Sequence, residues 1–242
     1  MYSGRKRQLL MDSVLLRGIP ESELKQIESF IRLASFKRGK TIFRKGEPGR
    51  GMMMVVSGRV KITSPAGGNE AFLAVVGPGE VFGEIALLDG GPRTADAVAL
   101  DDAELLVLDR RDFLPLVQRH PSAFLSLLEV LCARIRADTE MVEDFLFLDL
   151  PARLGRALRR LAERSGTPVE NGVRIDVRFS QRELGRTVGM TRESINKQLR
   201  IWRDRKILDI ADGHIVILDM EALSADIEGR EAGDAAEDDD ES

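Results

Sequence analysis

Cysteine and histidine are scarce in this sequence, and that scarcity limits the chemistry it can carry. Its 242 residues include one cysteine, Cys132, and two histidines, His120 and His214. A single thiol can form neither an internal disulfide nor a cluster held by four thiolates. Two widely spaced histidines and one cysteine offer no metal cluster and no activated nucleophile. We therefore expect no enzyme activity, no catalytic residue, no metal and no cofactor.

Long apolar runs are also missing. No stretch of about 20 apolar residues is present to span a bilayer, so we expect no membrane partner. Residues 1–18 carry basic residues and a few leucines without a long apolar stretch, and we expect no signal peptide there. The composition is otherwise that of an ordinary globular protein, which favours the cytoplasm.

Charge is distributed unevenly along the chain. The whole sequence has 36 Lys and Arg against 40 Asp and Glu, a net charge of −4. Residues 151–220, however, hold fifteen Lys and Arg against nine Asp and Glu. The negative total therefore does not argue against a nucleic-acid partner. Residues 226–242 are acidic and poor in apolar side chains, which predicts a disordered tail.

Hydrophobic periodicity organises the remaining chain. Residues 20–33 have the spacing of a short helix. Between 34 and 108, short β-rich runs alternate with glycine-bearing turns, which indicates a sandwich or barrel. The expected strands are residues 41–43, 52–56, 60–62, 71–76 and 104–108. The expected divisions are an extension (1–19), a β domain (20–120), a long helix (121–149), a second domain (150–225) and the tail (226–242).

One short segment, residues 83–95, carries a glycine, a carboxylate and an arginine together. Gly83 lets the backbone approach an anion, and the amides after it would open a short helix that attracts phosphate. Glu84 can accept from a sugar hydroxyl, while Arg93 offers a planar fork for two phosphate oxygens. Thr94 adds a hydroxyl. The alternative is an ordinary β-rich turn with a surface arginine.

The long helix carries a heptad pattern that is typical of two helices packing together. Its apolar positions are Phe124, Leu128, Leu131, Ile135, Val142 and Phe145. Asp138 occupies the position expected between Ile135 and Val142, with Thr139 beside it. A carboxylate in such a seam either sets the register of the pair or meets a ligand. The residues alone leave both possibilities open.

Residues 180–199 have the pattern of two helices joined by a tight turn. Ser180 with Glu183 forms a capping box for the first helix. Gly189 stands where the turn needs a left-handed residue, and Thr191 can cap the second helix. Around this pair we expect a helix at 152–164, a turn at 165–170 and a two-stranded hairpin at 208–218.

The second of these helices presents charged residues that suit a DNA groove. Arg192, Glu193 and Lys197 would project from its N-terminal half, the part that enters the major groove in helix-turn-helix proteins. These side chains can read guanine, cytosine and phosphate. The alternative is a three-helix protein-binding module with a solvated charged face.

The two constellations, in this order and joined by a heptad helix, resemble the Crp/Fnr family of bacterial transcription regulators over residues 20–220. The resemblance implies an α+β fold: a β jelly roll that binds cyclic nucleotides, a dimerisation helix and a C-terminal winged helix-turn-helix. The implied nucleotide-binding residues are Phe82, Gly83, Glu84, Ile85, Ala86, Arg93, Thr94, Ala95, Asp138 and Thr139. The implied DNA-binding residues are Ser180, Gln181, Thr191, Arg192, Glu193, Ser194 and Lys197.

The resemblance also implies the partners. They are a palindromic promoter site, a second copy of the chain, RNA polymerase and a cyclic nucleotide as effector. The iron–sulfur and haem branches of the family need several cysteines or axial ligands inside the β domain, and neither is found here. Cyclic AMP is favoured and cyclic GMP stays open, because Asp138 departs from the Thr-Ser pair typical of cyclic-AMP members. Lys197 stands where arginine is usual, so the half-site is expected to be similar to TGTGA without being identical.

Overall fold

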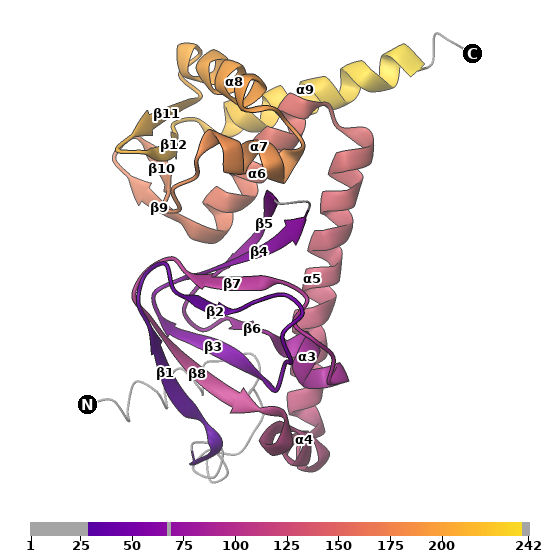
Figure 1. The fold of residues 1–242 in the computed structure, drawn as a ribbon. Helices are drawn as coiled ribbons and strands as arrows, with labels where there is room; N and C mark the ends of the chain where they lie inside the picture. Colours follow the sequence, from indigo (N-terminus) through magenta and orange to yellow (C-terminus); the bar gives the residue numbers. More distant parts are fainter. Residues whose placement is uncertain (1–28, 67–68, 239–242) are drawn as a thin grey trace. The chain divides into compact units, whose positions relative to one another are not determined.

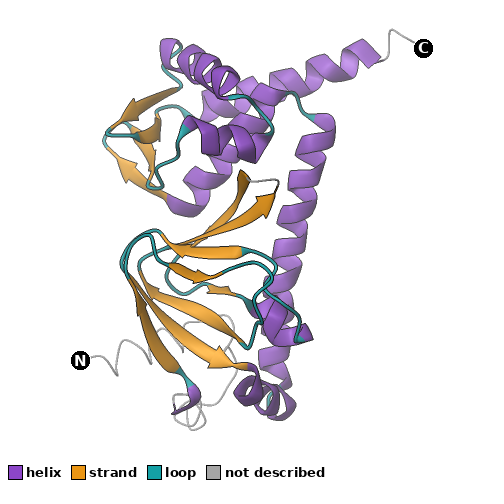
Figure 2. Cartoon of the chain, in the orientation of Figure 1, coloured by secondary structure: helices purple, strands orange, loops and turns teal. Residues whose placement is uncertain are grey.

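The computed structural model describes residues 29–66 and 69–238 (Figures 1 and 2). Residue contacts divide it into two units. The first unit runs to Ala137 and omits Asn69–Phe72, which group with the second unit, Asp138 onward. None of the helices in these ranges combines the length and apolar character that a membrane crossing requires.

The first unit is built on two four-stranded sheets. One has the order β1 (Arg32–Phe36), β8 (Ala103–Asp109), β3 (Gly51–Ser57), β6 (Val81–Phe82). The other has the order β2 (Thr41–Phe43), β7 (Asp96–Ala99), β4 (Val60–Ala66), β5 (Asn69–Val76). Strand pairs such as β1–β8 and β4–β7 are antiparallel. This double-sheet arrangement confirms the jelly roll.

Side chains alternate along β3 and so give the first sheet two buried faces. Val55 joins a core cluster with residues of the second sheet, including Ala97. Met52 and Met54 point the other way and join a cluster with Phe113 and Leu127. These last two belong to α4 (Arg110–Arg119) and α5 (Pro121–Phe147). The period-two side-chain pattern thus fixes which face meets the second sheet and which meets the helices.

The expected strands are confirmed, and so is the short helix expected after Gly83, which is α3 (Glu84–Asp89). Strands β1, β6 and β7 and helix α4 were not predicted. The helix expected at 20–33 lies mostly outside the described residues. Its C-terminal end was wrong, since β1 begins at Arg32, which pairs with Val107. Because that pairing joins distant parts of the chain, the local hydrophobic periodicity does not indicate it.

In the second unit, the junction between α5 and α6 (Leu150–Ser165) is a capped helix start. Asp149 accepts a hydrogen bond from the Ala152 amide at 2.7 Å. Pro151 stands in the first turn of α6, where an amide hydrogen has no intrahelical partner. The long helix ends at Phe147, close to the expected 149. The next helix therefore begins at Leu150, with Pro151 in its first turn.

The rest of this unit is a helix-turn-helix with a small sheet. It contains β9 (Gly166–Val169), β10 (Gly172–Ile175), α7 (Gln181–Val188), α8 (Arg192–Asp204), β11 (Leu208–Ala211) and β12 (His214–Ile217). The sheet order is β11-β12-β10-β9. Helices α7 and α8 and the β11–β12 hairpin were predicted and are confirmed. The turn expected at 165–170 was wrong, because residues 166–169 pair with β10 as a strand.

The last helix, α9 (Met220–Asp238), corrects the expectation of disorder from residue 226. Leu223 and Ile227, one turn apart, are 0% and 1% exposed. A Cβ added to Gly155 of α6 would lie 2.7 Å from Ile227 Cγ1, so the two helices pack closely. Acidic composition suggested disorder, but two apolar residues at helical spacing suffice to dock the start of this segment.

Candidate ligand site and DNA-reading element

Gly83 and Arg93 are fitted to each other. Gly83 has φ +75°, the left-handed region that favours glycine, and a Cβ there would lie 2.5 Å from Arg93 Nη1. The same Nη1 donates to the carbonyl oxygens of Gly83 at 2.8 Å and Gly51 at 2.7 Å. Glycine at 83 is therefore required both by its backbone and by the guanidinium beside it.

Arg93 is held in a buried position. It is 7% exposed, and its guanidinium carbon lies 4.2 Å from the centroid of the Phe43 ring. Burial lowers the pKa of Arg93 from its ordinary value, and the charges of Glu84 and Glu47 offset part of that shift. A buried cation whose hydrogen bonds go to backbone carbonyls is electrostatically suited to a further anion.

A loop between β2 and β3 clamps the backbone of Arg93. The Arg93 amide donates to Glu47 O at 2.8 Å, and the Arg93 carbonyl accepts from the Gly46 amide at 2.8 Å. A Cβ at Gly49 would lie 2.1 Å from Ala86 Cβ, so only glycine lets this loop approach α3. Glycine-bearing turns were predicted in this part of the chain, but the part of this loop in the site was not.

Glu84, the first residue of α3, is 1% exposed. Arg134 of α5 forms an ion pair with Glu84 Oε1 through Nη1, and its Nη2 donates to Val81 O. Neither carboxylate oxygen accepts a hydrogen bond from the residues that the structure describes. Such a buried acceptor costs free energy unless a donor reaches it. Glu84 therefore keeps acceptor capacity that a donor hydroxyl can use.

Arg134 was missed by sequence reasoning. It lies on α5 between the heptad positions Leu131 and Ile135, and one helical turn before Asp138. Its contact with Glu84 joins residues 50 positions apart in the chain, which a motif within 83–95 cannot reveal. The sequence did show a cation directly beside an apolar heptad position, and the packing of two helices does not account for that cation.

The other cassette residues divide between core and surface. Phe82, Ala86 and Ala95 are 1%, 2% and 8% exposed, so their side chains belong to the fold. Ile85, at 40%, and Thr94 are exposed. Asp138 and Thr139 are exposed on α5. The structure brings Gly83, Glu84 and Arg93 together, while Phe82 packs on Phe43 with ring centroids 5.8 Å apart.

The helix-turn-helix has the caps that its sequence predicted. Ser180 Oγ accepts from the Glu183 amide at 3.1 Å, and Glu183 Oε2 accepts from the Ser180 amide at 2.8 Å. Gly189 has φ +74° at the turn. Thr191 Oγ1 accepts from the Ser194 amide at 3.1 Å and so caps α8. These local bonds fix where both helices begin and how the chain passes between them.

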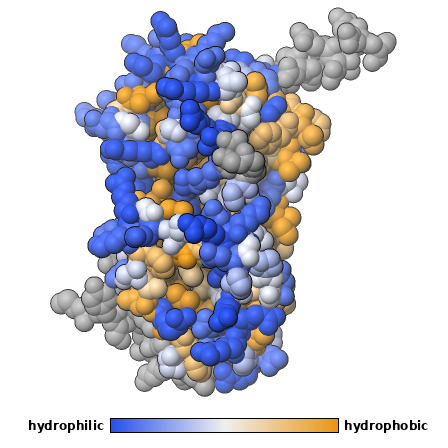
Figure 3. Space-filling view, viewed as in Figure 1, coloured by the Kyte–Doolittle hydropathy of each residue, from blue (hydrophilic) through white to orange (hydrophobic). Residues whose placement is uncertain are grey.

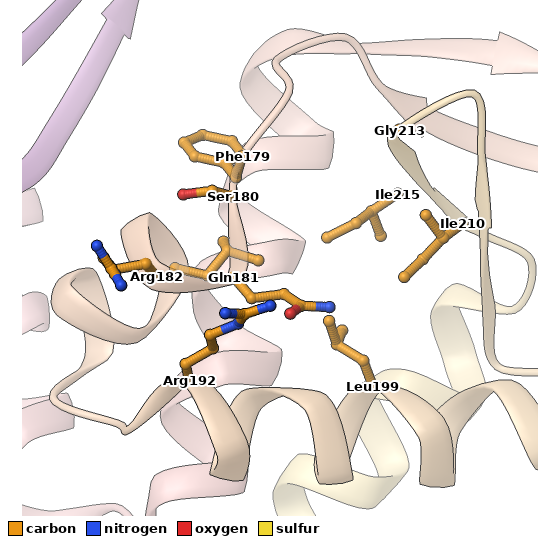
Figure 4. A pocket seen from close by; sticks show the side chains of 10 residues that line it. Phe179, Ser180, Gln181, Arg182, Arg192, Leu199, Ile210, Gly213 and Ile215 are labelled. Atoms are coloured by element: carbon orange, nitrogen blue, oxygen red, sulfur yellow. The ribbon is translucent and has the colours of Figure 1, made fainter.

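The N-terminal ends of both helices border a cavity of about 480 Å³, together with the β11–β12 hairpin (Figure 4). Arg192 extends from α8 toward Gln181 of α7 in this view. Arg192, Glu193 and Lys197 are exposed, as expected for residues that read a DNA groove. Below them, Ile195, Leu199 and Trp202 are buried. The apolar face of α8 thus holds the domain together and leaves its charged face free.

Two family matches coincide with these two sites. Residues 33–120 match the cyclic nucleotide-binding domain family, and residues 152–225 match the Crp-like helix-turn-helix domain family. The fold and the two sites thus define a regulator that binds a cyclic nucleotide through its β domain and DNA through its helix-turn-helix.

Relatives match nearly the full length. The CRP-like cAMP-activated global transcriptional regulator of Mycobacterium tuberculosis is 32% identical over 88% of this chain and 98% of its own. The cyclic AMP receptor protein of Thermus thermophilus is 33% identical over 87% and 95%. The global nitrogen regulator of Synechocystis is 30% identical over 78% and 86%.

Solved structures agree with the sequence relatives. The crystal structure of the Thermus thermophilus catabolite activator protein aligns with TM-score 0.52 and 30% identity, over 90% of this chain and 99% of that one. A transcriptional regulator of the CRP/FNR family from the same organism aligns with TM-score 0.69 and 27% identity, over 82% and 100%. The chain belongs to the Crp/Fnr family of transcription regulators.

Proposed function

We propose that this chain is a homodimeric transcription regulator whose DNA binding is gated by a cyclic nucleotide, with cyclic AMP favoured and cyclic GMP open. The observation that carries the proposal is the pairing of two buried charges beside Gly83: Arg93, which is bonded to carbonyls, and Glu84, whose oxygens accept no hydrogen bond from the described residues. A cyclic phosphate joined to a ribose carries the two complementary groups.

The phosphate would lie against Arg93. The Arg93 guanidinium is held by its hydrogen bonds to the carbonyl oxygens of Gly51 and Gly83, and its other N–H groups can donate to phosphate oxygens. The backbone amides near Ala86, and the Thr94 hydroxyl, supply further donors. An anion there would compensate the burial that lowers the pKa of Arg93.

The ribose hydroxyl would donate to Glu84. An ionised carboxylate only accepts hydrogen bonds, so it suits a group that donates. Arg134 forms an ion pair with Glu84, and the carboxylate keeps hydrogen-bond capacity. Arg134 therefore acts on the ligand through Glu84.

The base would meet Asp138 and Thr139. They stand about one turn beyond Arg134 on α5, on the helix that already reaches Glu84. Asp138 can accept from the adenine amino group or from the N–H groups of guanine, which is why both nucleotides stay in the proposal. In a dimer, these residues can come from both subunits.

The dimer would form along α5. Heptad positions Leu128, Ile135 and Val142 are 37%, 63% and 56% exposed, whereas Leu127 faces the β-sheet core at 0%. Figure 3 shows apolar side chains gathered along α5. A helix that is apolar on two sides needs a second partner, and a heptad pattern suits another copy of the same helix.

A dimer would present two copies of α8 to DNA. Related by two-fold symmetry, they would meet half-sites about 34 Å apart, one turn of the duplex, on a palindrome. The nucleotide would favour the dimer arrangement that gives this spacing. RNA polymerase is the expected protein partner at such a promoter.

A regulator of the same fold that ignores nucleotides is the second candidate. Asp138, where cyclic-AMP members typically carry the first residue of a Thr-Ser pair, is the observation that favours it. Titration calorimetry with each nucleotide, followed by DNA mobility shift with and without it, separates the two. Heat with one nucleotide and a stronger shift in its presence support gating. Absence of heat with both supports the second candidate, and turnover of the nucleotide would mean an enzyme.

A further inference from the structure

One carboxylate of α9, Asp226, holds the C-terminal end of the recognition helix α8. Asp226 Oδ2 accepts a hydrogen bond from Trp202 Nε1 at 3.0 Å. Asp226 Oδ1 forms an ion pair with Nη1 of Arg205, the C-cap residue of α8. A single side chain outside the helix-turn-helix therefore contacts two positions at the end of α8.

The same carboxylate is linked to the start of α6. Arg230, one turn along α9, places its Nε 3.4 Å from Asp226 Oδ2 and donates Nη1 to Asp149 Oδ2 at 3.0 Å. Asp149 is the residue that caps α6 through its other oxygen. A continuous series of polar contacts thus runs from Trp202 and Arg205 through Asp226 and Arg230 to the first turn of α6.

The burial of this network makes it more than a surface ion pair. The Asp226 side chain is 9% exposed, Trp202 is 0% exposed, and the adjacent Ile227 packs on Gly155 of α6. Burial raises the pKa of Asp226, but the hydrogen bond from Trp202 and the charges of Arg205 and Arg230 outweigh it. Removing the Asp226 carboxylate leaves the buried Trp202 N–H without this acceptor and takes from α8 its contact with α9 through Arg205.

We propose that Asp226 is a positioning residue for DNA reading: it sets the orientation of α8 against α6, and so the place of Arg192 and Lys197, which stand at the other end of the same helix. Because α8 is rigid, a small tilt at Trp202 and Arg205 moves the base-reading end of the helix. Contacts to bases depend on that geometry, whereas attraction to phosphates depends mainly on charge.

The test compares two duplexes and uses the full chain. One duplex is selected from a random pool by the unmodified protein, and the other has unrelated sequence, both under the nucleotide condition that gives the highest affinity. Asp226→Asn keeps an acceptor for Trp202 and removes the charge that faces two arginines. We expect about tenfold weaker binding of the selected duplex. Binding of the unrelated duplex should change by less than about twofold.

Glu228→Gln is the matched control, because Glu228 is an exposed acid on the same helix. It changes the net charge by the same amount and should alter neither affinity by more than about twofold. If Asp226→Asn and Glu228→Gln behave alike, or if Asp226→Asn weakens both duplexes equally, the positioning role is wrong.

Arg205→Gln keeps the proposal testable if Asp226→Asn fails to fold, since the Arg205 side chain is 51% exposed and its loss removes a single bond of the network. Arg205→Gln should lower affinity for the selected duplex alone. In a variant that folds, combining it with Asp226→Asn should add little to the loss, because both substitutions break the same ion pair between Arg205 and Asp226. Equal losses on both duplexes would mark Arg205 as a phosphate contact and overturn the coupling to Asp226.

Discussion

Two carboxylates, one in each unit, differ in how completely the protein satisfies them. Asp226 in the DNA-binding unit accepts a hydrogen bond from Trp202 and forms ion pairs with Arg205 and Arg230. Glu84 in the β unit is more deeply buried at 1% exposure, yet it has an ion pair and accepts no hydrogen bond from the described residues. The acceptor capacity left on Glu84 supports the proposed contact with a ligand hydroxyl, and the full set of partners on Asp226 supports its proposed positioning role.

The cations of the two proposed sites also differ in burial. Arg192 and Lys197 are exposed, which suits the proposed contact with DNA, a large surface. Arg93 is buried, which suits the proposed contact with a small ligand that the protein surrounds.

The largest expected effect comes from removing the buried cation of the ligand site. Arg93→Ala should weaken nucleotide binding by about 3 kcal/mol or more, because it removes charge-assisted bonds to the phosphate. Calorimetry measures the affinity, and sedimentation should show an unchanged dimer. Arg59→Gln, which breaks the ion pair with Asp101 elsewhere in the same unit, is the control. Unchanged affinity in Arg93→Ala would contradict the assignment of the cassette.

The exposed DNA-reading cation should give a smaller and more selective loss. Arg192→Ala is expected to cost about 1–3 kcal/mol in binding of a specific site, as for a bidentate contact to a base. Competition binding with single-base variants of the site measures it, and discrimination should relax at one base pair. A uniform loss on all sequences would instead identify a phosphate contact.

The proposed hydrogen bond from the ribose hydroxyl to Glu84 can be tested by changing either the protein or the ligand. Glu84→Gln replaces a charged acceptor by a neutral one and should weaken cyclic AMP binding about tenfold. A cyclic AMP analogue without the ribose 2′-hydroxyl should already be weak and should lose little more in the variant. Calorimetry on the four combinations gives the coupling. Equal losses for both ligands would mean that Glu84 does not meet the hydroxyl.

The satisfied carboxylate should produce the smallest effect, visible as a pH dependence. The pKa of Asp226 is held below its ordinary 3.8, so its ionised form stabilises the folded state. That stabilisation is present above about pH 4 and is lost as pH falls through the lowered pKa of the folded state. The difference in unfolding free energy between the unmodified protein and Asp226→Asn should therefore shrink below pH 4, as urea unfolding can measure. A difference that stays constant with pH would contradict this.

Local features were readable from the sequence. Gly83, Glu84 and Arg93 lie within one short segment, and the Ser180–Glu183 capping box closes over a single turn. Strands β2, β3, β4, β5 and β8 follow from apolar runs between turns. In each case the residues that define the feature are also neighbours in the chain.

Features that depend on distant contacts were not readable. Arg134 reaches Glu84 from another element, and Gly49 is needed only because Ala86 lies 2.1 Å from where its Cβ would be. Residues 226–230 were assigned to a disordered tail from their charge. Asp226 and Arg230 are ordered because Trp202, Arg205 and Asp149 supply partners that composition cannot indicate.

The most direct test of the central claim is a crystal structure of the full chain grown with cyclic AMP. We expect the cyclic phosphate on Arg93, the ribose hydroxyl on Glu84, and Arg134 still paired with that carboxylate. A nucleotide bound elsewhere, or a site in which protein side chains fill the space between Arg93 and Glu84, would contradict it.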